Sequence, residues 1–331
     1  MQNSHPRVLL TGATGFVGSH LYPVLVDCGF EVLCGTRNAA EARKNAPECT
    51  FCHFDLDDRS SVESALSKVD RAIYLVHSMA ERADYEEHER KNARSFRDAA
   101  ERCGLERIVY LGGMRPAGRV SRHLASRLET GKVLRSGKVP VIELQATMVV
   151  GGGSESFRIV RDLAARLPFM LLPKWLESRS EPVAVLDIVE AIAHAVSMPI
   201  TEQRIFAAPG PESMSGREII VRTARAFGQK PKVLTVPFVT PRLSSYWIRL
   251  VTRANPHVAT ELVEGLRSNI EARGPEIWDL MSDYPRTPYD EAVKFALGED
   301  AADLPRGARI LETIMHAVTR STPRSATIHS R

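Results

Sequence analysis

The residues best suited to chemistry are three glycines near the N-terminus, Gly12, Gly15 and Gly18, in the segment TGATGFVG. They follow a strand-length apolar run at residues 8–10 and precede apolar residues at helical spacing. Backbone amides at a glycine-rich turn into a helix have no partners inside the helix, and they lie at the positive end of the helix dipole. The turn therefore predicts a phosphate-binding site.

A second strand, residues 31–35, follows this turn after a helix-length interval, and Arg37 comes directly after the strand. In dinucleotide-binding folds an acid at this position grips the ribose 2′-hydroxyl, whereas an arginine accommodates a 2′-phosphate. Because a guanidinium offers forked donors to phosphate, Arg37 favours NADP(H) over NAD(H) as the cofactor. The alternative is a solvated loop arginine. Within the turn, Gly12 would allow the tight bend, Gly15 the approach of a diphosphate, and Gly18 close packing of the helix.

The spacing G-x-x-G-x-x-G resembles that of the extended and atypical short-chain dehydrogenases/reductases. The segments YLVHSM, IVYLGG, SRHLASR and TPRLSSYW are similar to atypical members related to NmrA-like proteins and to the 39-kDa-type subunit of respiratory complex I. This resemblance covers most of residues 7–275. It implies a Rossmann fold that binds a dinucleotide.

The resemblance also implies where the cofactor would be contacted. Asp55 would contact the adenine amino group, with the Leu56 backbone beside it, and His77 would lie under the nicotinamide ribose. The full predicted set of cofactor contacts is Gly12, Thr14, Gly15, Phe16, Val17, Gly18, Arg37, Asp55, Leu56, His77 and Arg127.

The catalytic residues of that superfamily are a serine after the fifth strand and Tyr-x-x-x-Lys on the next helix. Gly112 or Gly113, His123 and Arg127 occupy the corresponding positions, so all three groups are changed. Imidazole titrates near neutrality, so His123 is a candidate proton donor, whereas Arg127 could hold ribose hydroxyls but cannot act as a base. The alternatives are a helix-start histidine bonded locally and an arginine in a surface ion pair. The resemblance supports binding more strongly than catalysis.

Short apolar runs alternate with helical segments, which predicts a doubly wound parallel α/β sheet of the Rossmann type with a smaller C-terminal lobe. The predicted strands are residues 8–10, 31–35, 50–54, 72–76, 107–111, 139–144 and, last of all, 204–208. Residues 168–176 are predicted to form an apolar loop. Asp57 or Asp58 is expected to cap a helix, Asp187 is expected to cap another, and Ser215 with Glu218 forms a capping box.

The domain organisation follows from this pattern. Residues 1–153 are predicted to form the dinucleotide-binding domain, with its sheet completed by about residues 181–208. Residues 154–180 and 209–320 would form the smaller lobe for a substrate or partner, and residues 321–331 a disordered tail. Residues 237–251 are expected to be a further amphipathic segment.

Composition excludes several classes of protein. The net charge of +4 is mild and dispersed, which argues against nucleic acid and fits an anionic cofactor. No signal peptide or membrane-spanning run is visible, and the five cysteines lack framework spacing, so we expect a cytoplasmic protein. Residues 49–53 match the C-x-x-C-H haem-attachment pattern, but an ordinary strand is favoured and no metal site is predicted.

Two segments, residues 157–175 and 241–253, interleave arginines with apolar residues, a pattern that can lie on anionic membranes but more often packs over a substrate cleft. Two functions stay open. One is an NADP(H)-dependent oxidoreductase acting on a small apolar carbonyl or quinone-like compound. The other is a non-catalytic dinucleotide-binding sensor or assembly factor. Neither the substrate nor the oligomeric state is specified by the sequence.

Overall fold

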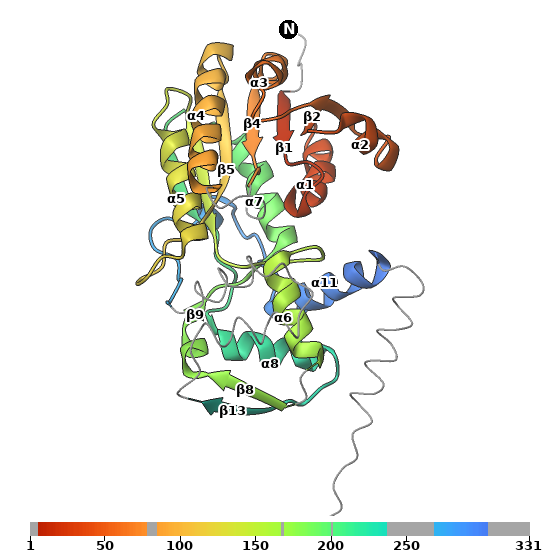
Figure 1. Cartoon of the computed structure of the whole chain (residues 1–331), viewed down its shortest axis with the longest axis vertical. Helices are drawn as coiled ribbons and strands as arrows, with labels where there is room; N and C mark the ends of the chain where they lie inside the picture. Colours follow the sequence, from red (N-terminus) through yellow and green to blue (C-terminus); the bar gives the residue numbers. More distant parts are fainter. Residues whose placement is uncertain (1–5, 78–84, 167–168, 200, 237–267, 304–331) are drawn as a thin grey trace, which may run out of the picture.

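A seven-stranded parallel sheet forms the centre of the protein (Figure 1). The computed structural model describes residues 6–77, 85–166, 169–199, 201–236 and 268–303. The strand order is β11-β6-β5-β4-β1-β2-β3. The strands are β1 (Arg7–Thr11), β2 (Glu31–Thr36), β3 (Thr50–His53), β4 (Arg71–Tyr74), β5 (Arg107–Gly113), β6 (Val141–Ala146) and β11 (Arg204–Ala207). The predicted doubly wound α/β fold is confirmed.

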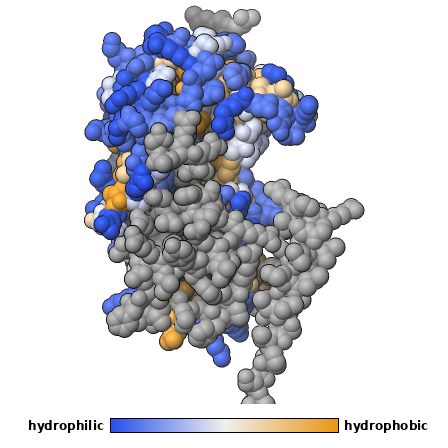
Figure 2. All heavy atoms as spheres, in the orientation of Figure 1, coloured by the Kyte–Doolittle hydropathy of each residue, from blue (hydrophilic) through white to orange (hydrophobic). Residues whose placement is uncertain are grey.

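Helices cover both faces of this sheet because its residues alternate between two apolar cores. Val8 and Leu10 of β1 pack in the core that contains α1 (Phe16–Asp27) and α7 (Val185–Ser197). Leu9 packs in the opposite core. That second core is formed with α3 (Arg59–Leu66), α4 (Tyr85–Cys103) and α5 (Arg122–Arg135). The charged side of α4 faces outward and forms part of a largely hydrophilic surface (Figure 2). The helix α2 (Ala39–Asn45) links β2 to β3.

A third core lies below the sheet, where α6 (Glu155–Arg166), α8 (Gly216–Ala226) and α11 (Tyr289–Asp303) pack together. Short strand pairs flank it. The pairs are β7 (Val149–Val150) with β10 (Val183–Ala184), β8 (Phe169–Pro173) with β13 (Lys232–Val236), and β9 (Arg179–Ser180) with β12 (Met214–Ser215). Two 3₁₀ turns, η1 (Lys174–Glu177) and η2 (Ile277–Leu280), complete the described elements.

Two predictions about this lower region are wrong. Residues 168–176 were expected to form a loop, but Phe169–Pro173 is β8, a strand paired in parallel with β13. Residues 204–208 were expected to hold the last strand, yet β12 and β13 follow it. In both cases the pairing partner lies far away in the sequence, so no local pattern identifies it.

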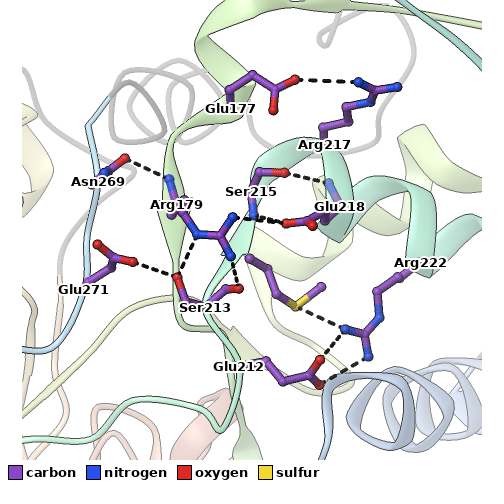
Figure 3. Close-up of polar contacts among 11 residues, drawn as sticks. Glu177, Arg179, Glu212, Ser213, Ser215, Arg217, Glu218, Arg222, Asn269 and Glu271 are labelled. Carbon is purple, nitrogen blue, oxygen red and sulfur yellow. Dashed lines mark hydrogen bonds and ion pairs between the residues drawn. The ribbon is translucent and has the colours of Figure 1, made fainter.

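An arginine–carboxylate network fastens the lower region (Figure 3). Arg179 donates from Nε to Ser213 Oγ at 3.0 Å, and its backbone amide donates to Asn269 Oδ1 at 2.9 Å. Arg222 pairs with Glu212 and donates to Asp290 Oδ1 at 2.8 Å. These bonds, with Glu212 first and Asp290 second, raise the pKa of Arg222 above its ordinary value. The network joins β9, β12 and α8 to residues 268–271 and to α11.

The helix-capping predictions have mixed outcomes. Asp58 is the cap of α3, where its side chain accepts from Ser60 N, and Ser215 with Glu218 forms the predicted capping box of α8. Asp187 is not a cap, because the N-cap position of α7 is Ala184. Asp187 is buried, 1% exposed, and its carboxylate accepts from Tyr284 Oη (3.1 Å), Thr287 N (2.9 Å) and Thr287 Oγ1 (2.7 Å). It therefore anchors the chain that leads into α11.

Replacing Asp187 by alanine should lower the free energy of unfolding by about 3 kcal/mol, because the buried carboxylate is lost together with its three hydrogen bonds, which leaves the half-buried Thr287 amide without this partner. Urea unfolding followed by circular dichroism measures this loss. The matched control, Asp58→Ala, removes an exposed cap and should cost clearly less. Equal losses in the two variants would show that Asp187 does not anchor the chain.

The two segments considered for membrane contact differ in what the structure describes. The apolar residues of α6, Phe157, Val160 and Ala164, are buried in the third core, so this side of the helix is not exposed to a bilayer. In the part of the chain that the structure describes, no helix is long and apolar enough to cross a membrane. The segments 237–251, 241–253 and 321–331 lie outside the described residues.

Candidate functional site

The glycine turn joins the C-terminal end of β1 to α1. Gly12 has a φ of +66°, and Gly15 N donates to the Gly12 carbonyl at 2.9 Å, which closes the turn. Gly15 is the N-cap of α1, and no side chain caps this helix end. A Cβ on Gly18 would lie 2.2 Å from the Gly12 carbonyl oxygen, so α1 packs directly on the turn. The tight bend and the close packing agree with the roles predicted for Gly12 and Gly18.

The turn is partly open to solvent. Thr14 and Gly15 are exposed, whereas Phe16 packs against the loop after β7, since a Cβ on Gly151 would lie 2.8 Å from the Phe16 ring. Thr11 Oγ1 donates to the Ile73 carbonyl at 2.9 Å and accepts from Leu75 N at 3.0 Å. These two bonds place the ends of β1 and β4 side by side, so the turn opens onto the C-terminal edge of the sheet.

The residues predicted to hold the adenosine lie at the ends of β2 and β3. Arg37 follows β2, is exposed, and its guanidinium forms no ion pair with any residue that the structure describes. Asp55 follows β3, where its Oδ1 accepts from Asp57 N at 3.0 Å. Ser61 Oγ donates to the Asp55 carbonyl at 3.0 Å and fixes the backbone there. Leu56 is buried, 8% exposed.

The three residues predicted for the reacting end also come together, although they lie on different elements. Arg127 Nη2 donates to the Leu111 carbonyl at 2.7 Å, which places the guanidinium beside β5. Tyr110 Oη donates to the Arg127 carbonyl at 2.9 Å, and the Tyr110 ring lies 6.2 Å from the His77 ring. Burial, followed by the nearby charges of Arg127 and His123, holds the pKa of His77 well below its ordinary value.

His123 is a weaker proton donor than its residue type suggests. Burial, with a smaller contribution from Arg127, lowers the pKa of His123 to about 3, so its ring is neutral at physiological pH. The adjacent phenol does not replace the missing acid, because burial raises the pKa of Tyr110 to about 12. A neutral imidazole can still form hydrogen bonds to an acceptor, but it does not supply the proton of an imidazolium.

The serine position is filled by other side chains. A Cβ on Gly112 would lie 2.9 Å from Glu143 Oε1, and a Cβ on Gly113 would lie 2.4 Å from Leu124 Cδ1. Glu143 is 1% exposed, pairs with Arg135, and accepts from Gln145 Nε2 at 2.9 Å. A serine at either glycine would have to displace these groups. Sequence reasoning missed Glu143, although a glutamate within the apolar segment VIEL is an available signal.

The low pKa values of His77 and His123 predict that the folded protein loses stability in acid. A histidine kept neutral in the folded protein titrates near pH 6.5 when unfolded, so below that pH the unfolded state binds more protons. The stability is therefore complete above about pH 6.5 and is lost as the pH falls toward the folded-state pKa. We expect a loss of about 2 kcal/mol per histidine between pH 7 and pH 5.

Urea unfolding at a series of pH values measures this loss. His123→Gln should flatten the pH dependence between pH 7 and pH 5, whereas His53→Gln, which replaces an exposed histidine, should leave it unchanged. An identical slope in the unaltered protein and in His123→Gln would contradict the low pKa of His123.

The C-x-x-C-H segment shows no ligand geometry. All five cysteines are free thiols, and burial raises the pKa of Cys52. Over residues 6–77, 85–166, 169–199, 201–236 and 268–303, no group of three or more His, Cys, Asp or Glu side chains could hold a metal ion. The segment forms β3, as the strand prediction expected.

The part of the chain that matches a known protein family is the region of the parallel sheet. Residues 8–138 match the NAD dependent epimerase/dehydratase family. A UDP-glucose 4-epimerase from Azospirillum brasilense is 27% identical over 114 residues, which make up 32% of this chain and 33% of that protein. The chain thus matches only a third of the length of this curated relative.

Two solved structures share the fold. The Thermus thermophilus UDP-glucose 4-epimerase complex with NAD has a TM-score of 0.64 and 20% identity, covering 90% of this chain and 100% of that one. The Citrobacter sp. triphenylmethane reductase complexed with NADP(H) has a TM-score of 0.69 and 16% identity, covering 87% and 99%. The family match over residues 8–138 agrees with the resemblance stated above, and the two structures share the Rossmann-type fold.

Proposed function

We propose, from the premise that residues 8–138 belong to the NAD dependent epimerase/dehydratase family, that this chain binds a dinucleotide along the C-terminal edge of its sheet. The observation that carries the proposal is the uncapped start of α1 at a glycine turn too tightly packed for any side chain at Gly18. The backbone amides at this helix start would hold the diphosphate, while the Gly15 amide closes the turn on the Gly12 carbonyl. Thr14, Gly15, Phe16 and Val17 supply the backbone at that point.

NADP(H) is the preferred cofactor in this proposal. Arg37 directly follows β2, is exposed and forms no ion pair within the described part of the chain, and a guanidinium binds a phosphate through paired donors. Asp55 and the Leu56 backbone would contact the adenine, and His77 and Arg127 would lie beside the nicotinamide ribose. The free cysteines suit the reducing cytoplasm that we expect for the protein.

The reaction that fits the site best is hydride transfer to a small quinone-like or conjugated carbonyl acceptor. The bound nicotinamide would supply the hydride. Among the described residues at the reacting end, burial raises the pKa of Tyr110 and keeps His123 neutral, so in this proposal the accompanying proton comes from water. Quinone-like acceptors suit this arrangement because their reduced oxygens take protons readily from solvent. His123 and Arg127 would then orient the acceptor and the ribose through hydrogen bonds.

A second candidate is a dinucleotide-occupied sensor or assembly factor without turnover. The observation that favours it is the closed serine position, where Glu143 and Leu124 occupy the space beside Gly112 and Gly113. In this case the crevice binds the dinucleotide, and the residues around the nicotinamide hold it without any hydride transfer.

NADPH oxidation with a panel of quinones and conjugated carbonyls separates the two candidates. Hydride transfer predicts turnover with at least one quinone, a loss of about tenfold in His123→Phe, and a larger loss in Arg127→Met. The exposed Arg204, which begins β11 and therefore lies at the opposite edge of the parallel sheet, gives the matched control Arg204→Met, which should retain full activity. Saturable NADPH binding with no oxidation across the panel would contradict hydride transfer and favour the sensor.

A further inference from the structure

His53 is the last residue of β3 and lies beside the predicted 2′-phosphate position. Its side chain is exposed, and its Nδ1 lies 3.1 Å from the backbone carbonyl oxygen of Arg37. We propose that His53 is a second specificity-determining residue for the cofactor, binding the adenosine 2′-phosphate in its protonated form together with Arg37. The proposal rests on the function proposed above, in which Arg37 binds that phosphate.

The hydrogen bond to Arg37 fixes which ring nitrogen faces the ligand. A carbonyl oxygen only accepts, so His53 Nδ1 must carry the proton that it donates. In the neutral ring Nε2 is then an acceptor, which repels phosphate oxygens. In the imidazolium form Nε2 carries a proton and becomes a donor. Binding of the 2′-phosphate at His53 is therefore coupled to the uptake of a proton.

Charged groups of both signs lie near His53. Arg37 follows β2. Arg43 of α2 donates from Nη2 to the carbonyl of Phe51, which lies in β3 with His53, at 2.7 Å. Asp58 faces His53 from the start of α3, where the Ser60 side chain first and His53 among the weaker causes lower the pKa of Asp58. A phosphate arriving between Arg37 and His53 adds the negative charge that stabilises the imidazolium.

The position of His53 in the strand makes it available for this role. Phe51 is buried in the sheet core, and Cys52 and His53 point to opposite faces because successive strand residues alternate. Cys52 and His53 therefore do not act together as a pair of metal ligands. Within the C-x-x-C-H segment, His53 is the residue that ends the strand and is available to bind a ligand. Thr36 and His53 end the adjacent parallel strands β2 and β3 in register with each other, and Arg37 follows Thr36 directly.

The test measures the ratio of the NADH and NADPH dissociation constants at about pH 6 and about pH 8 by fluorescence titration. The free 2′-phosphate loses charge near pH 6, so a site without His53 should prefer NADPH less in acid. We expect the ratio to rise about three- to tenfold from pH 8 to pH 6 in the unaltered protein, and to stay level or fall in His53→Gln. Isothermal titration in two buffers of different ionisation enthalpy should show proton uptake on NADPH binding that His53→Gln lacks.

Two variants keep this test separate from the cofactor proposal. Arg37→Gln should reduce the ratio at both pH values, and an unchanged ratio in that variant would overturn the role of Arg37 itself. Arg37→Gln could reduce the ratio while His53→Gln shows the same pH dependence of the ratio, and the same proton uptake on NADPH binding, as the unaltered protein. That result would overturn the role of His53 and leave the role of Arg37 standing.

Discussion

Replacing Gly18 by alanine is expected to weaken NADPH binding by at least about 100-fold and to lower the free energy of unfolding by about 3 kcal/mol. The added Cβ would lie 2.2 Å from the Gly12 carbonyl oxygen and 2.8 Å from Ala13 Cα. Both are backbone atoms, so they cannot move aside as a flexible side chain would. Relief requires a shift of the turn that presents its amides to the diphosphate.

The matched control is Gly298→Ala in α11. A Cβ there would meet nothing within 4 Å, and alanine is favoured over glycine inside a helix by about 1 kcal/mol. This variant should be as stable as the unaltered protein or slightly more so, with unchanged NADPH affinity. Fluorescence titration and urea unfolding of both variants measure these effects. Gly18→Ala with normal affinity and stability would contradict the close packing of α1 on the turn.

The second large effect is expected from Arg37→Asp, which should invert the cofactor preference so that NADH binds more tightly than NADPH. The reversal replaces an attraction with a repulsion between like charges a few ångströms apart, and we expect the ratio of dissociation constants to change by about 100-fold or more. Stability should be nearly unchanged, because the Arg37 guanidinium is exposed and forms no ion pair within the described part of the chain.

A charge reversal elsewhere controls for the net charge of the protein. Arg119 is an exposed arginine on the loop after β5, and Arg119→Asp should weaken NADPH and NADH alike or leave both unchanged. If Arg37→Asp behaves in the same way as Arg119→Asp, Arg37 does not bind the 2′-phosphate.

The parts of the site that sequence alone predicted are those made by neighbouring residues. The turn at Gly12 depends on the strand before it and the helix after it, all within one short segment. Arg37 was placed correctly at the end of β2 because a strand edge is visible as the end of an apolar run. His77, His123 and Arg127 were assigned to one place by the resemblance to the short-chain dehydrogenases/reductases, and the structure brings the three side chains near one another.

The remaining features depend on residues that meet from far apart in the chain. Asp187 was expected to cap its own helix, but its partners Tyr284 and Thr287 lie nearly a hundred residues later. The strand β8 was missed because its partner β13 lies far away in the sequence, so the residues around β8 do not indicate the pairing. Glu143 closes the serine position only because β6 lies beside β5 in the sheet. Local sequence carries no signal for such pairings.

The central claim, that a dinucleotide lies along the C-terminal edge of the sheet with its 2′-phosphate at Arg37, is tested most directly by a crystal structure of the protein with NADPH. We expect the diphosphate at the amides of the turn between Gly12 and Gly18, and a 2′-phosphate oxygen about 3 Å from the Arg37 guanidinium. An NADPH molecule bound away from the turn, or bound there with its 2′-phosphate pointing away from Arg37, would contradict the claim.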